Sequence, residues 1–196
     1  LELQQIETFG DLQFNIPSIT YTRGNFTGGS MSIRGVASAA VAASGDGAVA
    51  YHLDSVPLPT SIFETEFYDV ERVEVLRGPQ GTLYGANATA GTVNLIFAKP
   101  TNEASASVEL EYGDYDSRKL KLAMNLPFTD SLRLRFSGMS LRRDGFITNM
   151  FPGKEGEDVD GRKISSYRAI LEADLSENTL ARFTFMNFEE DDNRAR

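Results

Sequence analysis

The sequence predicts a small α+β domain followed by a series of antiparallel β-strands. In the first hundred residues, short β-rich runs are separated by glycine- and proline-rich connectors, as in a compact mixed domain. After Pro100 the pattern changes, because apolar and polar side chains alternate with the period of two that strands have. No apolar run approaches the roughly 18 residues of a transmembrane helix. We therefore divide the chain into residues 1–100 and residues 101–196.

Residues 1–100 are expected to hold one short helix and several strands. Residues 8–14 fit a helix that ends before Pro17, because the residue preceding a proline avoids the helical region. Asp54 and Ser55 fit a turn between two strands. The strands expected in this half cover residues 19–22, 31–34, 48–53, 70–76 and 92–97.

The last two of these strands are joined by a glycine-rich connector. Its glycines are expected to let the backbone adopt positive φ and to pack closely against a neighbouring segment. A phosphate-binding loop is a poor fit, because Gly85 is followed by Ala86 where a P-loop needs lysine, and the dinucleotide spacing G-x-G-x-x-G is missing.

Residues 101–196 predict five strands of roughly 9–13 residues, near the ~9–11 that cross a bilayer at a tilt. Val108, Leu110 and Tyr112 alternate with glutamates, and the later segments repeat this pattern. A bulge is expected at Gly138, where the apolar positions change phase. The turns expected between strands cover residues 113–116, 127–131, 144–162 and 176–178, and an acidic run at 189–192 is expected to begin a further loop. Alternation by itself favours a soluble antiparallel sandwich, which shows the same period.

Composition excludes several kinds of chemistry. The net charge of −9 without a basic patch argues against nucleic-acid binding. The chain has no cysteine, so disulfides, zinc–thiolate sites and thiol catalysis are excluded. His52 is the one histidine and has no partner histidine or cysteine for a metal. Asp158, Asp160 and Gly161 resemble only a fragment of a calcium loop. We expect no metal, no cofactor and no catalytic residues.

The segment ERVEVLRGPQGTLYG, followed by AGTVNLI and KPT, resembles the plug signature of TonB-dependent outer-membrane receptors. Further matches in the same order are IPSI, SIRG and YHLDSVPL, where Ser55 occupies a position at which the family often has glycine. The signature positions are Glu71, Arg72, Gly78, Pro79, Gly81, Tyr84, Gly85 and Gly91.

This resemblance implies an α+β plug domain followed by antiparallel β-strands of an incomplete transmembrane β-barrel. It also implies a signal peptide, a TonB-contact segment and further barrel strands outside these residues, in a barrel of about 22 strands. The implied function is active import of a scarce nutrient such as an iron–siderophore or cobalamin across the outer membrane of a Gram-negative bacterium. The implied partners are outer-membrane lipid, the TonB protein and a small-molecule nutrient such as a metal chelate. Short turns would face the periplasm and long loops the exterior.

The resemblance also implies roles for individual residues. Arg34 and Arg77 would pair with barrel glutamates and lock the plug in place. Ligand contacts are expected on loops that face the exterior, at Arg23, Asn25, Phe26 and Phe63. Two alternatives stay open, a soluble periplasmic plug-like binding or sensor module and a secreted β-rich hydrolase. The hydrolase would need catalytic residues that this sequence does not show.

Overall fold

The computed structural model describes residues 6–24, 28–37, 47–58, 66–85 and 87–193. The chain forms two compact units, Leu1–Ala98 and Lys99–Arg196, which we call the N-terminal and C-terminal units. The boundary expected at Pro100 lies next to this division. Within the described residues, every helix is too short and too polar to cross a membrane.

The N-terminal unit begins with a single helical segment. It consists of the 3-10 turn η2 (Phe9–Asp11) and the helix α1 (Leu12–Asn15), as expected for residues 8–14. The Asp11 carboxylate accepts hydrogen bonds from the backbone N–H of Thr8 at 2.7 Å and from its hydroxyl at 2.8 Å, which satisfies donors at the start of the segment. The remaining elements are β1 (Ile19–Gly24), β2 (Gly28–Ile33), β3 (Val49–Leu53), β4 (Val56–Pro57), β5 (Val70–Arg77), α2 (Gly81–Tyr84) and β6 (Gly91–Phe97).

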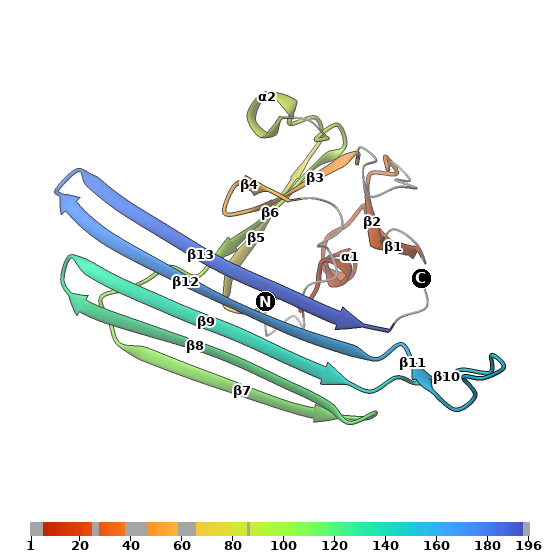
Figure 1. The fold of residues 1–196 in the computed structure, drawn as a ribbon. Helices are drawn as coiled ribbons and strands as arrows, with labels where there is room; N and C mark the ends of the chain where they lie inside the picture. Colours follow the sequence, from red (N-terminus) through yellow and green to blue (C-terminus); the bar gives the residue numbers. More distant parts are fainter. Residues whose placement is uncertain (1–5, 25–27, 38–46, 59–65, 86, 194–196) are drawn as a thin grey trace. The chain divides into compact units, whose positions relative to one another are not determined.

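A four-stranded sheet in the order β4-β3-β6-β5 organises this unit, and β1 and β2 form a separate antiparallel pair (Figure 1). Strands β3 and β6 run parallel, whereas β5 and β6 are antiparallel. Every residue of β6 is buried, including the polar residues Thr92 and Asn94, which form hydrogen bonds there. Phe9 packs edge-to-face on Phe67, with ring centroids 4.8 Å apart, and on Tyr51 at 5.7 Å. These rings attach the N-terminal helical segment to the sheet.

The C-terminal unit is an antiparallel meander with five long strands, as the alternation predicts (Figure 1). The sheet order is β13-β12-β9-β8-β7, so each long strand pairs with its neighbours in the chain. The connection between β9 and β12 carries a small hairpin of β10 and β11. The bounds are β7 Ser105–Gly113, β8 Ser117–Thr129, β9 Leu132–Arg143, β10 Ile147–Thr148, β11 Asp158–Val159, β12 Arg162–Ser176 and β13 Thr179–Asp192.

Two expectations for this unit are wrong. The acidic run at 189–192 does not begin a loop, because β13 continues through Asp192. Nor is there a bulge at Gly138, which lies opposite both Leu122 and Tyr167 in an unbroken register. Met139 and Leu141 therefore share a face with Ser137. The apparent change of phase arises because these two apolar residues lie on the face that otherwise carries polar side chains.

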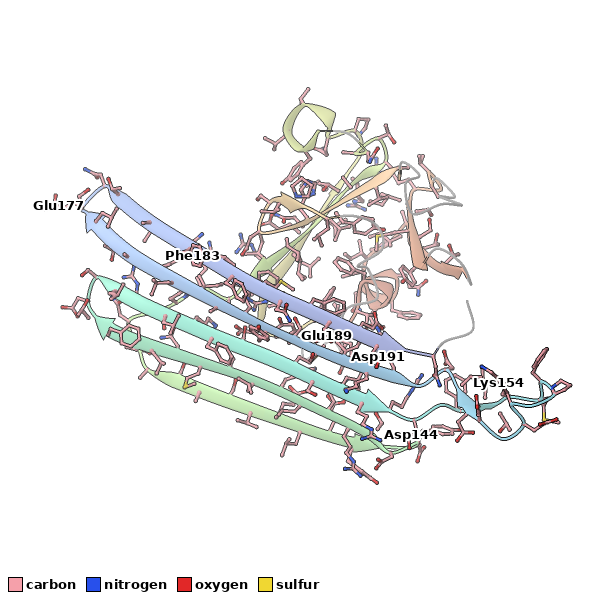
Figure 2. The ribbon with its side chains drawn as sticks, viewed as in Figure 1. Asp144, Lys154, Glu177, Phe183, Glu189 and Asp191 are labelled. Carbon is pink, nitrogen blue, oxygen red and sulfur yellow. The ribbon has the colours of Figure 1, made fainter. Side chains whose placement is uncertain are left out.

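The two faces of this sheet differ in chemistry. We call one the apolar face, because it carries large apolar side chains in register across all five long strands. Many of them are exposed, for example Val108 at 68%, Leu110 at 75% and Phe183 at 67% (Figure 2). The opposite, polar face carries the charged residues of the alternation, such as Glu109 opposite Lys121. A sheet that exposes its apolar side is the expected wall of a membrane barrel.

Candidate functional site

The glycine-rich connector between β5 and β6 turns at glycines, and among the described residues it packs tightly at one of the four signature glycines. Gly78 has φ of 103° and Gly85 has φ of 77°, a region that favours glycine. Within the described residues, a Cβ at Gly78, Gly81 or Gly85 would meet no atom within 4 Å, so close packing at these three positions stays a prediction. At Gly91 a Cβ would clash with the carbonyl oxygen of Leu76. Glycine is therefore needed sterically where β6 begins beside β5.

Other signature residues lie on the exposed side of β5 and at its end. Arg72 forms ion pairs with Glu71 and, at 2.8 Å, with Glu74. Pro79 follows the strand and is exposed. Glu71, Arg72 and Pro79 are exposed, so these side chains lie outside the core that the described residues form.

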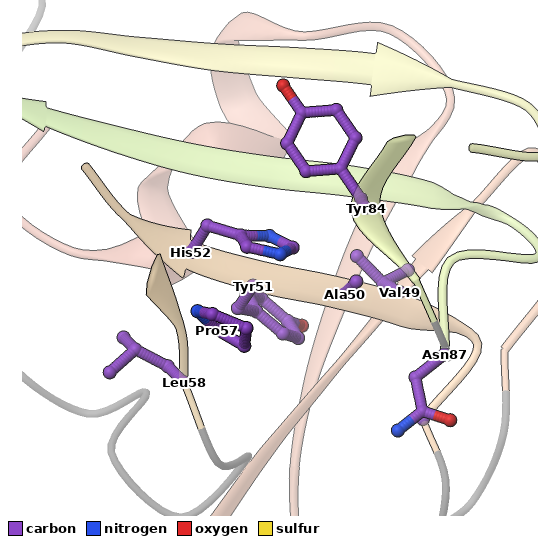
Figure 3. Close-up of a pocket in the computed structure, with 9 residues that line it drawn as sticks. Val49, Ala50, Tyr51, His52, Pro57, Leu58, Tyr84 and Asn87 are labelled. Atoms are coloured by element: carbon purple, nitrogen blue, oxygen red, sulfur yellow. The ribbon is translucent and has the colours of Figure 1, made fainter. Parts of the chain in front are cut away.

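His52 and Tyr84 attach the connector to the sheet (Figure 3). Tyr84 ends α2, and its ring meets the imidazole of His52 edge-on with centroids 4.9 Å apart. The Nδ1 atom of His52 lies 3.0 Å from the Thr92 hydroxyl oxygen, within hydrogen-bond distance. Burial lowers the pKa of His52, and a hydrogen bond with the Tyr84 backbone opposes this effect. This contact could not be predicted from the sequence, because residues 52 and 84 are brought together only by the fold.

The cavity beside His52 is too small for a nutrient. Its volume is about 70 Å³, and Tyr51, Pro57, Leu58 and Tyr84 are among its lining residues (Figure 3). Ligand pockets usually enclose about 300–1,000 Å³. Among the described side chains, no three histidines, aspartates or glutamates converge as metal ligands would. We interpret the cavity as a packing defect under α2.

The two expected locking arginines lie at the ends of strands. Arg34 follows β2 with φ of 55°, and its backbone N–H donates to the Ser18 carbonyl at 2.8 Å. Arg77 is the last residue of β5 and lies opposite Gly91. Both are exposed. Within the described part of the chain, no ion pair joins either guanidinium to a carboxylate.

The expected ligand contacts lie outside what the structure describes. Asn25, Phe26 and Phe63 are not among the described residues, and of Arg23 only the backbone, in β1 opposite Gly29, is described.

The polar face of the C-terminal unit is cross-linked by ion pairs between neighbouring strands. Lys121 contacts Glu109 at 3.1 Å, which joins β7 to β8. Glu172 on β12 contacts Arg182 on β13 at 2.6 Å and Arg133 on β9 at 3.7 Å. One carboxylate thus connects three strands. Such a row is typical of the interior of a barrel, where charged side chains find partners away from lipid.

Comparison with known proteins gives a consistent result. Residues 1–92 match the family described as the TonB-dependent Receptor Plug Domain. The pesticin receptor of Yersinia pestis is 32% identical over 145 residues, which are 72% of this chain and 21% of that receptor. The ferripyoverdine receptor of Pseudomonas aeruginosa is 37% identical over 112 residues, 56% of this chain and 12% of that receptor.

Solved structures extend the similarity beyond the first 92 residues. The ferric yersiniabactin uptake receptor FyuA from Yersinia pestis superposes with a TM-score of 0.78 and 27% identity, covering 95% of this chain and 29% of that one. The pyoverdine outer membrane receptor FpvA from Pseudomonas aeruginosa PAO1 gives a TM-score of 0.73 at 24% identity, covering 94% of this chain and 25% of that one, and so shows the fold alone. The chain therefore spans about a fifth to a third of the length of such receptors.

Proposed function

Because this chain belongs to the TonB-dependent receptors, we propose that it is the gating part of an active importer of iron–siderophore complexes in the outer membrane. The observation that carries the proposal is the plug-domain match over residues 1–92 together with a likeness to a ferric yersiniabactin uptake receptor over 95% of the chain. Two similar proteins are named as receptors for ferripyoverdine and for ferric yersiniabactin, so a ferric chelate is favoured over cobalamin as the cargo. This function involves binding and transport, and no covalent step.

In the proposed mechanism the plug acts as a mechanical gate. The chelate binds from outside, and the TonB protein then pulls on the periplasmic side of the plug. A compact unit with one four-stranded sheet and one separate strand pair suits this role, because its sheets depend on few strand pairs. The connector held by His52 and Tyr84 is a discrete contact that a pull can break.

The proposed orientation places the short hairpin turns in the periplasm. The turns after β8 and β12 each contain two residues between paired strand ends, Thr129 with Leu132 and Ser176 with Thr179. The connection between β9 and β12 is long and carries its own hairpin. Barrels of this class have short periplasmic turns and longer outer loops. The hairpin of β10 and β11 would then lie outside the cell.

Locking and ligand contacts complete the proposal. Arg34 and Arg77 are exposed, and no carboxylate of the described residues pairs with either. An arginine that is buried on assembly needs a carboxylate to offset its desolvation, so barrel glutamates are the natural partners. Arg23, Asn25, Phe26 and Phe63 stay the proposed contacts of the chelate, through charge and aromatic stacking.

Uptake of radiolabelled cargo, with labelled iron in the ferric chelates and labelled cobalt in cobalamin, by cells that carry the receptor gene tests this function. Ferric yersiniabactin, ferripyoverdine and cobalamin would each be supplied to cells with and without the tonB gene. We expect one ferric chelate to bind in both strains and to accumulate only in the strain that has TonB. Accumulation without TonB, or a receptor recovered in the soluble periplasmic fraction, would contradict the proposal.

A further inference from the structure

Three basic side chains lie side by side at one edge of the apolar face. Arg118 on β8 is directly opposite Arg142 on β9, and Arg142 is directly opposite Lys163 on β12. Directly opposite residues of an antiparallel pair point to the same side of the sheet. We call Arg118, Arg142 and Lys163 the basic row. It lies at the end of the sheet where Asp144 and Asp191 are labelled, away from Glu177 (Figure 2).

The basic row marks the border of the apolar face. The adjacent row, two residues along each strand, contains Leu120 opposite Ser140 on β8 and β9. From Leu120 the apolar face continues along β8 to Leu126, roughly 20 Å at the usual rise per residue. Beyond the basic row lie the hairpin turn at 114–116 and the long connection after β9. The three cations therefore lie where the membrane-facing surface of the wall ends.

Each cation of the basic row has a carboxylate nearby, and Asp191 on β13 lies directly opposite Lys163. Like charges directly opposite each other destabilise a sheet, so these carboxylates offset the repulsion within the row. Asp116 contacts Arg118 at 2.7 Å, but the contact of Asp144 with Arg142 is long, at 3.9 Å. The side chains of Arg118 and Arg142 stay 65% and 67% exposed. Both guanidinium groups thus retain donors that face outward.

A groove at the same place joins these donors to the apolar face. Its volume is about 470 Å³, and its lining includes Leu110, Tyr112, Arg118, Leu120, Ser140 and Arg142. The leucines give it an apolar base, and the two arginines lie at its polar end. Glu111 also lines the groove, but Lys119 neutralises it at 3.1 Å.

We propose that this groove binds an anionic membrane lipid by its phosphate. Arg118 and Arg142 donate hydrogen bonds to the phosphate oxygens, Lys163 adds its charge, and an acyl chain lies over Leu110 and Leu120. A lipid is favoured over free phosphate, because the groove opens onto the apolar face and an isolated anion would leave its leucines uncovered. Tyr112 lies beside Arg118, a suitable place for an aromatic ring at a membrane interface. The proposal depends on the barrel wall and not on which cargo is imported.

Lipid binding by the complete, purified receptor tests the proposal. Native mass spectrometry would compare phosphatidylglycerol, phosphatidylcholine and inorganic phosphate as probes. We expect retention of phosphatidylglycerol by the unmodified receptor, weak retention of phosphatidylcholine, and little competition from phosphate. The double variant Arg118→Gln/Arg142→Gln is expected to bind phosphatidylglycerol tenfold or more weakly, since each basic residue at an anionic surface contributes measurably to binding.

Two matched variants control for charge and folding. Lys99→Gln/Lys154→Gln removes the same charge from exposed positions elsewhere and is expected to leave lipid binding unchanged. Arg118→Lys/Arg142→Lys keeps the charge and is expected to retain most of the binding, while heat-modified gel mobility reports whether each barrel is folded. Equal binding of the two lipids, full competition by phosphate, or unchanged binding in the glutamine double variant would each overturn the proposal.

Discussion

The turn between β3 and β4 contains two consecutive residues in the left-handed region. Asp54 has φ of 46° and Ser55 has φ of 70°, and Leu53 pairs with Val56 across them. Positive φ at both central residues is what a type I′ hairpin turn requires, and glycine usually fills the second position. The turn is nevertheless well anchored, because the Ser55 N–H donates to the Asn94 side-chain oxygen at 3.0 Å.

Replacing Ser55 by glycine is therefore expected to stabilise the plug. The left-handed conformation costs a non-glycine residue about 1–2 kcal/mol, and the added freedom of glycine in the unfolded chain offsets part of the gain. We expect a net increase of about 0.5 kcal/mol in the free energy of unfolding, measured by denaturant titration of the purified receptor. Ser55→Ala removes the same hydroxyl but keeps the Cβ, so it should give no increase. A glycine variant less stable than the alanine variant would contradict this explanation.

His52 is expected to make the plug less stable at acidic pH. In the folded state, burial lowers the pKa of His52 below the ordinary value of about 6.5, and in the unfolded chain His52 keeps that ordinary value. As the pH falls below 6.5, the unfolded state takes up a proton that the folded state excludes, so stability falls. Hydrogen exchange in peptides from β3 and β6, corrected for intrinsic rates, should show faster opening at pH 5.5 than at pH 7.5. The His52→Gln variant should lose most of this difference. If the variant keeps the pH dependence of the unmodified receptor, His52 is not its cause.

At the scale of elements, Asn125 on β8 fixes the segment that leads into β7. Its side-chain oxygen accepts from the Thr101 N–H at 2.9 Å, and its amide donates to the Thr101 carbonyl at 2.8 Å and to the Glu103 carbonyl. One buried side chain thereby satisfies several backbone groups of a segment that belongs to no strand.

Replacing Asn125 by alanine should release this segment. Residues 101–104 are exposed, so water can replace the lost partners, and each lost hydrogen bond costs about 0.5–1.5 kcal/mol. We expect faster hydrogen exchange in a peptide covering residues 101–104 of the receptor, with β12 and β13 unaffected. The control Asn102→Ala removes only an exposed contact with Arg133. Equal exchange in the two variants would show that Asn125 does not hold the segment.

The strands of the C-terminal unit could be predicted because their signals are local. A period of two and a turn every dozen residues are visible in the sequence, and each long strand pairs with its neighbour in the chain. The bulge expected at Gly138 is wrong, because periodicity shows where apolar residues recur but not which face of the sheet they occupy. Met139 and Leu141 lie on the polar face without any break in register. Their register with Ser166 and Ile164 settles the face.

For the whole molecule, the harder features to predict are contacts between distant residues. The parallel pairing of β3 with β6 brings Tyr51 opposite Val93, and no local pattern encodes it. The same pairing creates the contact of His52 with Thr92, so a histidine that appears isolated in sequence has a structural role. The family signature identified the plug, and within the described residues Gly78 and Gly85 serve the path of the backbone through their positive φ.

The C-terminal unit alone is expected to aggregate in water. Its sheet ends at β7 and β13, and side chains such as Leu110 and Phe183 are exposed on its apolar face. Residues 99–196 expressed by themselves should form large particles in light scattering and become dispersed in detergent. A monomeric sample that melts cooperatively without detergent would favour a soluble sandwich instead.

The central claim is that the long strands form a membrane wall with one face toward lipid. Cysteine scanning of β7 tests it most directly, since this chain contains no cysteine of its own. Spin labels would be placed one at a time at residues 108–111 of an otherwise cysteine-free receptor in lipid vesicles, and their accessibility to oxygen and to a water-soluble nickel chelate would be measured. We predict that labels at Val108 and Leu110 are accessible to oxygen and protected from the nickel chelate. Labels at Glu109 and Glu111 should not show this preference for oxygen over the chelate. Equal accessibility at all four positions, or free access of the chelate to Val108 and Leu110, would contradict the claim.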